Sequence, residues 1–135
     1  MKTFTFKIAL LLVLSFNFIS CAQSSGAKKS DVVSLISPQE FKDKLGEDIQ
    51  LIDVRTPQEF AEGHLDGAIM IDYMQSDFMD KMSKLDKNKD LYIYCRSGNR
   101  SGKATRKLES MGFPKIYDLK GGILNWNQNN MKVIK

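Results

Sequence analysis

The chain has 135 residues, of which 42% are hydrophobic and 27% charged, a composition that fits one globular domain. Its formal net charge is +4, and without Lys2 and Lys7, the basic residues of the first twenty, 18 basic side chains remain against 16 acidic ones. Because this imbalance is small and spread along the chain, it gives no support to nucleic-acid binding, and we expect no nucleic-acid partner.

The first twenty residues have the pattern of an export signal. Lys2 and Lys7 come before an apolar run over residues 8–14, which is too short to cross a membrane comfortably. We therefore predict a signal peptide over residues 1–20 and exclude it from the fold.

The segment that follows this apolar run, Phe-Ile-Ser-Cys at residues 18–21, resembles a bacterial lipobox. The resemblance implies that Cys21 is lipidated and anchors an exported protein on the periplasmic side of a bacterial membrane. Cleavage after Ala22, which would release a soluble secreted protein, and retention of an uncleaved anchor are the alternatives. Small and polar side chains over residues 21–30 predict a flexible tether between the anchor and the domain.

From residue 31 to residue 135, short apolar runs alternate with segments of helical pattern. Strands are predicted at residues 32–36, 49–54, 68–71, 91–94 and 116–119, and helices after Pro38, after Pro57, near residues 78–85, over residues 101–111 and from residue 123. Ser37 with Glu40, and Thr56 with Glu59, have the spacing of capping boxes. The alternation predicts an α/β domain with a mostly parallel central sheet of about five strands and helices on both faces.

Cys95 follows the apolar run 91–94 and comes shortly before a predicted helix. Backbone N–H groups of residues 96–100 can turn inward around the sulfur, and the helix adds its positive end. These conditions favour a thiolate nucleophile, and we predict that Cys95 is catalytic. The predicted substrate-binding residues are those of the loop: Arg96, Ser97, Gly98, Asn99 and Arg100. Gly98 permits unusual backbone angles, and the two arginines would attract an anionic substrate.

Two blocks of the sequence, residues 51–68 and residues 94–101, resemble the single-domain rhodaneses, which are sulfurtransferases. The late Gly121-Gly122-Ile123 and Trp126 fit the same family, and the likeness covers residues 31–135. The resemblance implies a rhodanese-like fold and a cycle in which Cys95 takes a sulfur as a persulfide. It implies a small anionic sulfur donor such as thiosulfate, a thiol or cyanide-like acceptor, and no metal or organic cofactor. No feature indicates an obligate assembly, and we expect a monomer.

Asp53 and Arg55 stand at the end of the second predicted strand, beside the expected position of the Cys95 loop. We predict supporting roles for both, as an ion pair or hydrogen bonds that hold neighbouring turns. The single histidine, His64, is interpreted as a structural hydrogen-bonding residue and not as a general base.

Two other functions stay open at this stage. A cysteine phosphatase or arsenate reductase could use the same scaffold, although its loop carries one more residue than the six from Cys95 to Arg100. The domain could also be a persulfide carrier or binding module whose turnover is incidental.

Overall fold

The structure is a computed structural model that describes residues 31–135. The predicted signal peptide over residues 1–20, the lipid anchor at Cys21 and the tether over residues 21–30 lie outside the described residues and stay predictions. Within residues 31–135, none of the helices combines the length and the apolar character that crossing a bilayer requires.

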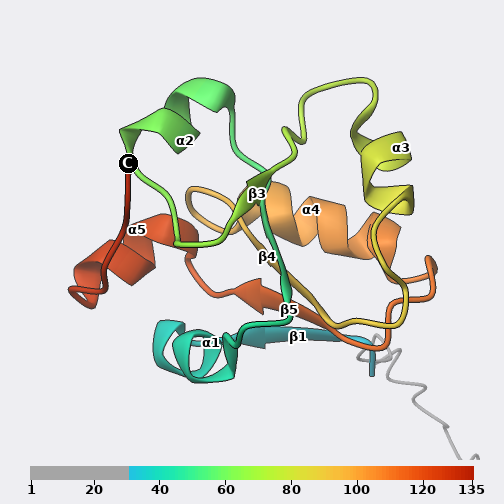
Figure 1. Cartoon of the computed structure of the whole chain (residues 1–135), viewed down its shortest axis with the longest axis horizontal. Helices are drawn as coiled ribbons and strands as arrows, with labels where there is room; N and C mark the ends of the chain where they lie inside the picture. Colours follow the sequence, from blue (N-terminus) through green and yellow to red (C-terminus); the bar gives the residue numbers. More distant parts are fainter. Residues whose placement is uncertain (1–30) are drawn as a thin grey trace, which may run out of the picture.

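The core of the fold is one sheet of five strands, in the order β1-β5-β4-β2-β3, and every pair is parallel (Figure 1). The strands are β1 (Val33–Ile36), β2 (Gln50–Asp53), β3 (Ile69–Met70), β4 (Leu91–Tyr94) and β5 (Ile116–Leu119). All four residues of the central β4 are buried, as a strand covered on both faces requires. The prediction of an α/β domain with a parallel sheet is confirmed.

The described residues also form five helices: α1 (Pro38–Lys44), α2 (Pro57–Glu62), α3 (Phe78–Ser83), α4 (Asn99–Leu108) and α5 (Gly122–Gln128). Residues of α3 and α4 belong to one apolar cluster, and residues of α1 and α5 belong to another, so the two pairs lie on opposite faces (Figure 1). The predicted helix over 101–111 begins two residues earlier, because Gly98 adopts a left-handed conformation (φ 94°) and starts it.

Both predicted capping boxes are present. At α1, Ser37 accepts from the Glu40 backbone, and the Glu40 carboxylate accepts from the Ser37 N–H at 3.0 Å. At α2, Thr56 and Glu59 repeat the arrangement with the same 3.0 Å distance. Each box satisfies N–H groups that the first turn of a helix leaves unpaired.

Side chains of β4 alternate between the two apolar clusters. Leu91, Ile93 and Cys95 belong to the cluster under α3 and α4, whereas Tyr92 and Tyr94 belong to the cluster under α1 and α5. Because successive side chains of a strand point to opposite faces, this pattern sets Cys95 toward α4.

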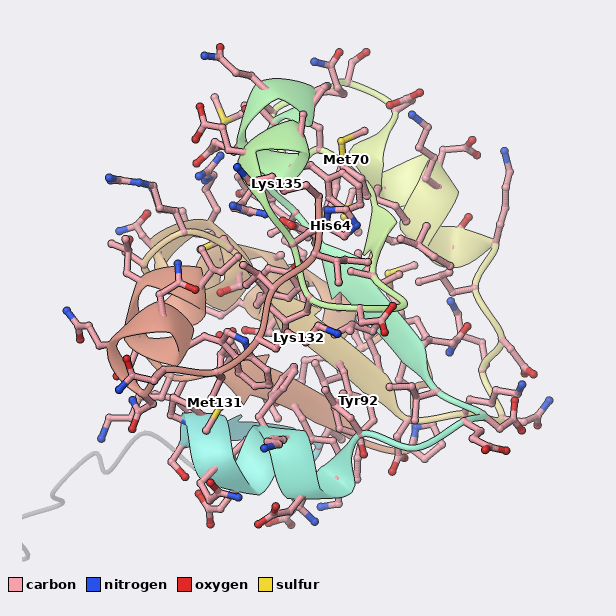
Figure 2. The ribbon with its side chains drawn as sticks, turned by 60° about the vertical axis from the view of Figure 1, so that its left-hand side comes forward. His64, Met70, Tyr92, Met131, Lys132 and Lys135 are labelled. Atoms are coloured by element: carbon pink, nitrogen blue, oxygen red, sulfur yellow. The ribbon has the colours of Figure 1, made fainter. Side chains whose placement is uncertain are left out.

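The C-terminal segment runs from α5 across the molecule to the end of α2 (Figure 2). The Trp126 indole donates to the Lys132 carbonyl at 3.0 Å, and His64 and Ile134 exchange two backbone hydrogen bonds of 2.9 and 2.8 Å. The His64 ring stacks on Phe60 and its Nδ1 lies 3.0 Å from the Phe60 carbonyl. His64 therefore has the structural role that the sequence indicated.

The turn between β5 and α5 packs directly against the loop that follows β4. The N–H groups of Ile123 and Leu124 donate to the carbonyls of Cys95 and Arg96, at 2.9 and 3.1 Å. Gly122 makes this approach possible, because a Cβ at that position would lie only 2.4 Å from the Cys95 carbonyl oxygen. Its φ of 60° also suits glycine best.

We expect Gly122→Ala to lower the free energy of unfolding by more than about 2 kcal/mol, because the added methyl group would overlap the Cys95 and Arg96 carbonyls. Urea unfolding measures this change. The matched control is Gly46→Ala, where a Cβ meets nothing within 4 Å, and its effect should stay within about 0.5 kcal/mol. Equal stability of the two variants would contradict this account of the turn.

Candidate active site

Cys95 lies immediately after β4 and faces the first turn of α4. Its sulfur accepts hydrogen bonds from the Gly98 N–H at 3.1 Å and from the Ser101 hydroxyl at 3.5 Å. The residue is only 1% exposed. Although it packs at the end of an apolar cluster, the sulfur itself meets two polar donors, which favour a negative charge.

The predicted ring of inward N–H groups takes a different form in the structure. Among the described residues, Gly98 is the backbone donor to the sulfur, and the second donor is the side chain of Ser101, which was not among the predicted site residues. The N–H groups of Asn99, Arg100 and Ser101 have no acceptor within residues 31–135, because they form the first turn of α4. They remain free for an anion at this helix end.

Arg100 points to α2, where its guanidinium makes two hydrogen bonds with the Glu59 carboxylate, of 2.7 and 2.6 Å. The Arg100 side chain, helped by donors of Thr56 and opposed by partial burial, lowers the pKa of Glu59 to about 2. Glu59 thus caps α2, as predicted, and also ties it to α4. Because this pair neutralises Arg100, the guanidinium contributes less to the attraction of an anion than its position in the loop suggested.

Arg55 and Asp53 form a buried ion pair of 2.6 Å at the end of β2. Arg55 also donates to the Gly63 carbonyl at 2.7 Å, which fixes the turn after α2. Burial, and then the charge of Asp53, raise the pKa of Tyr94, whose hydroxyl accepts from the Leu65 N–H at 3.1 Å. Asp53 and Arg55 therefore hold neighbouring turns together, and their supporting role in the reaction stays a prediction.

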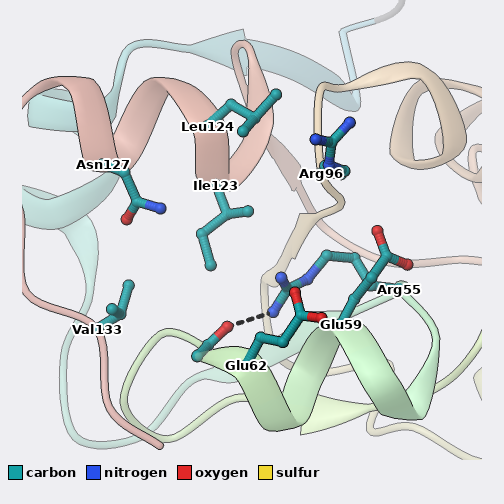
Figure 3. A pocket seen from close by; sticks show the side chains of 9 residues that line it. Arg55, Glu59, Glu62, Arg96, Ile123, Leu124, Asn127 and Val133 are labelled. Carbon is teal, nitrogen blue, oxygen red and sulfur yellow. Dashed lines mark hydrogen bonds between the residues drawn. The ribbon is translucent and has the colours of Figure 1, made fainter.

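A pocket of about 270 Å³ opens between α2, α5 and the Cys95 loop (Figure 3). Arg55 and Arg96 supply positive charge to its wall, Glu59 and Glu62 supply negative charge, and the apolar part comes from Ile123, Leu124 and Val133. Arg55 is paired, whereas Arg96 is exposed and has no ion-pair partner among residues 31–135. Arg96 is thus the cation of this pocket that is free to meet an anionic ligand.

No group of three histidine, cysteine, aspartate or glutamate side chains within residues 31–135 is arranged to hold a metal ion.

We expect Glu59→Gln to lower the free energy of unfolding by about 1–2 kcal/mol at pH 7, because it removes the charge that pairs with Arg100. The folded-state pKa of about 2 lies below the ordinary value of 4.5. The stabilisation is therefore complete above pH 4.5 and is lost as the pH falls toward 2. Unfolding curves measured over this range should show that the difference in unfolding free energy between Glu59→Gln and the unmodified chain shrinks as the pH falls.

Glu62→Gln is the matched control, because Glu62 lies on the same helix, is exposed, and has no ion pair among residues 31–135. Its effect should stay within about 0.5 kcal/mol at every pH. If the loss of unfolding free energy in Glu59→Gln were the same at pH 5 and at pH 2, the ion pair of Glu59 with Arg100 would not have the stabilising role assigned to it.

Comparisons with known proteins agree with this geometry. The model of the rhodanese-like domain family matches residues 37–129. A sulfurtransferase of Allochromatium vinosum is 35% identical over 65% of this chain and 80% of its own length. Thiosulfate sulfurtransferase 16 of Arabidopsis thaliana, a chloroplast protein, is 35% identical over 78% of this chain and 96% of its own length.

Among solved structures, a rhodanese-related protein from Thermoplasma volcanium superposes with a TM-score of 0.66 and 28% identity, over 73% of this chain and 95% of that one. The sheet has five parallel strands, a cysteine lies between β4 and α4, and the family model matches most of the domain. This chain belongs to the rhodanese-like domain family.

Proposed function

We propose that this rhodanese-like chain is a sulfurtransferase that carries sulfur on Cys95 as a persulfide. One observation carries the proposal: the Cys95 sulfur accepts from the Gly98 N–H and the Ser101 hydroxyl at the N-terminal end of α4. Hydrogen-bond donors and the positive end of a helix both favour a thiolate, which is the nucleophilic form. The sulfurtransferases among the relatives support the same class of reaction.

In the proposed cycle, the Cys95 thiolate attacks the outer sulfur of thiosulfate or a similar anionic donor. The sulfur–sulfur bond of the donor breaks, sulfite leaves with the electron pair, and Cys95 holds a persulfide anion. A thiol or cyanide-like acceptor then attacks the outer sulfur of the persulfide and returns the thiolate. Both steps keep negative charge beside the first turn of α4, where N–H groups stabilise it.

Charge around the site favours an anionic donor that arrives near Arg96. Of the three arginines around the loop and the pocket, Arg55 pairs with Asp53 and Arg100 pairs with Glu59. Arg96 also lines the pocket and has no ion-pair partner among residues 31–135, and Glu62 on the same wall is likewise unpaired in this part of the chain. A single exposed cation attracts an anion by about 1 kcal/mol, which is enough to affect donor binding.

We expect Cys95→Ala to abolish the formation of thiocyanate from thiosulfate and cyanide, because no other thiol lies within residues 31–135. A colorimetric assay on these residues, with circular dichroism to show that the fold is retained, measures the loss. Sulfur transfer at the unmodified rate in this variant would rule the mechanism out. Turnover of an aryl phosphate without thiocyanate formation would favour the phosphatase alternative.

We expect Arg96→Ala to raise KM for thiosulfate about five- to tenfold with little change in kcat, because the side chain attracts the donor from an exposed position. The difference should shrink as ionic strength rises. Lys103→Ala, which removes an exposed charge further along α4, is the control and should leave KM within about twofold. Equal effects of Arg96→Ala and Lys103→Ala on KM would show that only the net charge of the protein, and not the position of Arg96, affects donor binding.

A further inference from the structure

The pocket beside the Cys95 loop offers more contacts than the proposed sulfur donor can use. Thiosulfate is a compact inorganic dianion with no apolar part and no cationic group. The pocket, of about 270 Å³, has apolar and acidic side chains besides its arginines. Its volume lies near the lower end of the range for pockets that take small organic molecules, about 300–1,000 Å³. The remaining contacts can therefore be matched to the other substrate of the cycle, the sulfur acceptor.

Two charged side chains of this pocket have no partner. Arg55 and Glu59 are held in ion pairs with residues outside the pocket. Arg96 and Glu62 are exposed and make no ion pair or side-chain hydrogen bond within residues 31–135. Arg96 comes from the loop after β4 and Glu62 from the last turn of α2 (Figure 3). A ligand that satisfies both needs an anionic group for Arg96 and a cationic group for Glu62.

Apolar side chains accompany these two charges. Ile123 and Leu124 belong to the first turn of α5, and Val133 belongs to the C-terminal segment. Leu124 is 40% exposed, although it is a large apolar side chain. The aliphatic carbon atoms of a ligand would remove such a surface from water, whereas an inorganic anion would leave it wet.

The pocket borders the loop that holds the reactive sulfur. Arg96 directly follows Cys95, and the Ile123 N–H donates to the Cys95 carbonyl at 2.9 Å. Glu59, from α2, holds Arg100 at the other end of the loop. A molecule in the pocket therefore lies against this loop, on the side of α2 and α5. Because sulfite leaves before the acceptor reacts, Arg96 is available again for the second substrate.

We propose that the sulfur acceptor of this site is a small organic thiol that carries both an ammonium group and a carboxylate, as cysteine and short cysteine peptides do. Glu62 receives the ammonium group and Arg96 receives the carboxylate. Leu124 and Val133 cover the aliphatic part. Glu62 is thus the residue that selects among thiols. This inference rests on the proposed function, since it names the acceptor of the same cycle.

The transfer step needs no further reactant. The acceptor thiol loses its proton to water, and the thiolate attacks the outer sulfur of the Cys95 persulfide. The sulfur–sulfur bond of the persulfide breaks, and Cys95 leaves as a thiolate with the electron pair. The acceptor keeps the transferred sulfur as its own persulfide.

A set of small thiols separates the two charges. Mercaptoethanol carries neither, cysteamine carries an ammonium group, mercaptopropionate carries a carboxylate, and cysteine carries both. The rate of sulfite release by the full chain, at saturating thiosulfate, gives kcat/KM for each acceptor. The comparison is made at equal thiolate concentration, because the thiolate is the attacking form. We expect cysteamine and mercaptopropionate each to exceed mercaptoethanol about three- to fivefold, and cysteine about tenfold.

Glu62→Gln removes the acidic group and keeps the shape of the side chain. It should bring the ratio of kcat/KM for cysteamine to that for mercaptoethanol close to unity, because the ammonium group loses its partner. Glu109→Gln is the matched control: Glu109 is exposed at the end of α4 and has no ion pair among residues 31–135. It should leave this ratio unchanged. Equal kcat/KM values for cysteamine and mercaptoethanol in the unmodified chain, or the same fall in both variants, would overturn the proposal.

Binding tests the pocket without sulfur transfer. S-methylcysteine carries both charges but has no thiol, so it can occupy the pocket without reacting. In an NMR titration of the full chain, the amide signals of Gly63, Leu124 and Asn127 should shift to saturation, because these residues line the pocket. The Kd should be about three- to fivefold higher in Glu62→Gln.

The two measurements separate this inference from the proposed function. If no thiol supports sulfite release but S-methylcysteine binds with the expected dependence on Glu62, the proposed function fails and the assignment of the pocket is supported. If sulfite is released equally with all the thiols and S-methylcysteine shifts none of these signals, the proposed function is supported and the inference is overturned.

Discussion

The position of the active-site loop depends on one close contact, in which the carbonyl groups of Cys95 and Arg96 accept hydrogen bonds from the first turn of α5. Gly122 leaves no room there for a side chain. Because β4 is central in a parallel sheet, the loop has a rigid strand on one side and α5 on the other. The sulfur can then stay at the N-terminal end of α4, within reach of the Gly98 N–H, even when no substrate holds it there.

Charge pairing around this loop is selective. Asp53 neutralises Arg55, and Glu59 neutralises Arg100, so that two arginines hold α2, the turn at Gly63 and α4 in place. The remaining exposed cation at the pocket is Arg96 (Figure 3). Arg55 and Arg100 thus support the fold, and Arg96 is the arginine available to attract a substrate. This division explains how a strongly basic loop can be stable and still present a positive charge to an anion.

Much of the fold could be predicted from the sequence, because apolar runs, capping boxes and glycine stops are local signals. The strand order β1-β5-β4-β2-β3 could not, since strands that pair from distant parts of the chain leave no local pattern. For the same reason the sequence showed Glu59 as a cap but not its pairing with Arg100, which lies 41 residues away. The family match, which covers residues 37–129, agrees with the resemblance found from two motifs.

The central claim is that the Cys95 sulfur accepts a second sulfur atom, and intact-protein mass spectrometry after brief exposure to thiosulfate tests it most directly. The account predicts that residues 31–135 gain the mass of one sulfur atom, that the added sulfur maps to Cys95, and that cyanide removes it. A chain whose mass does not change, or that carries the added sulfur at another residue, would contradict it.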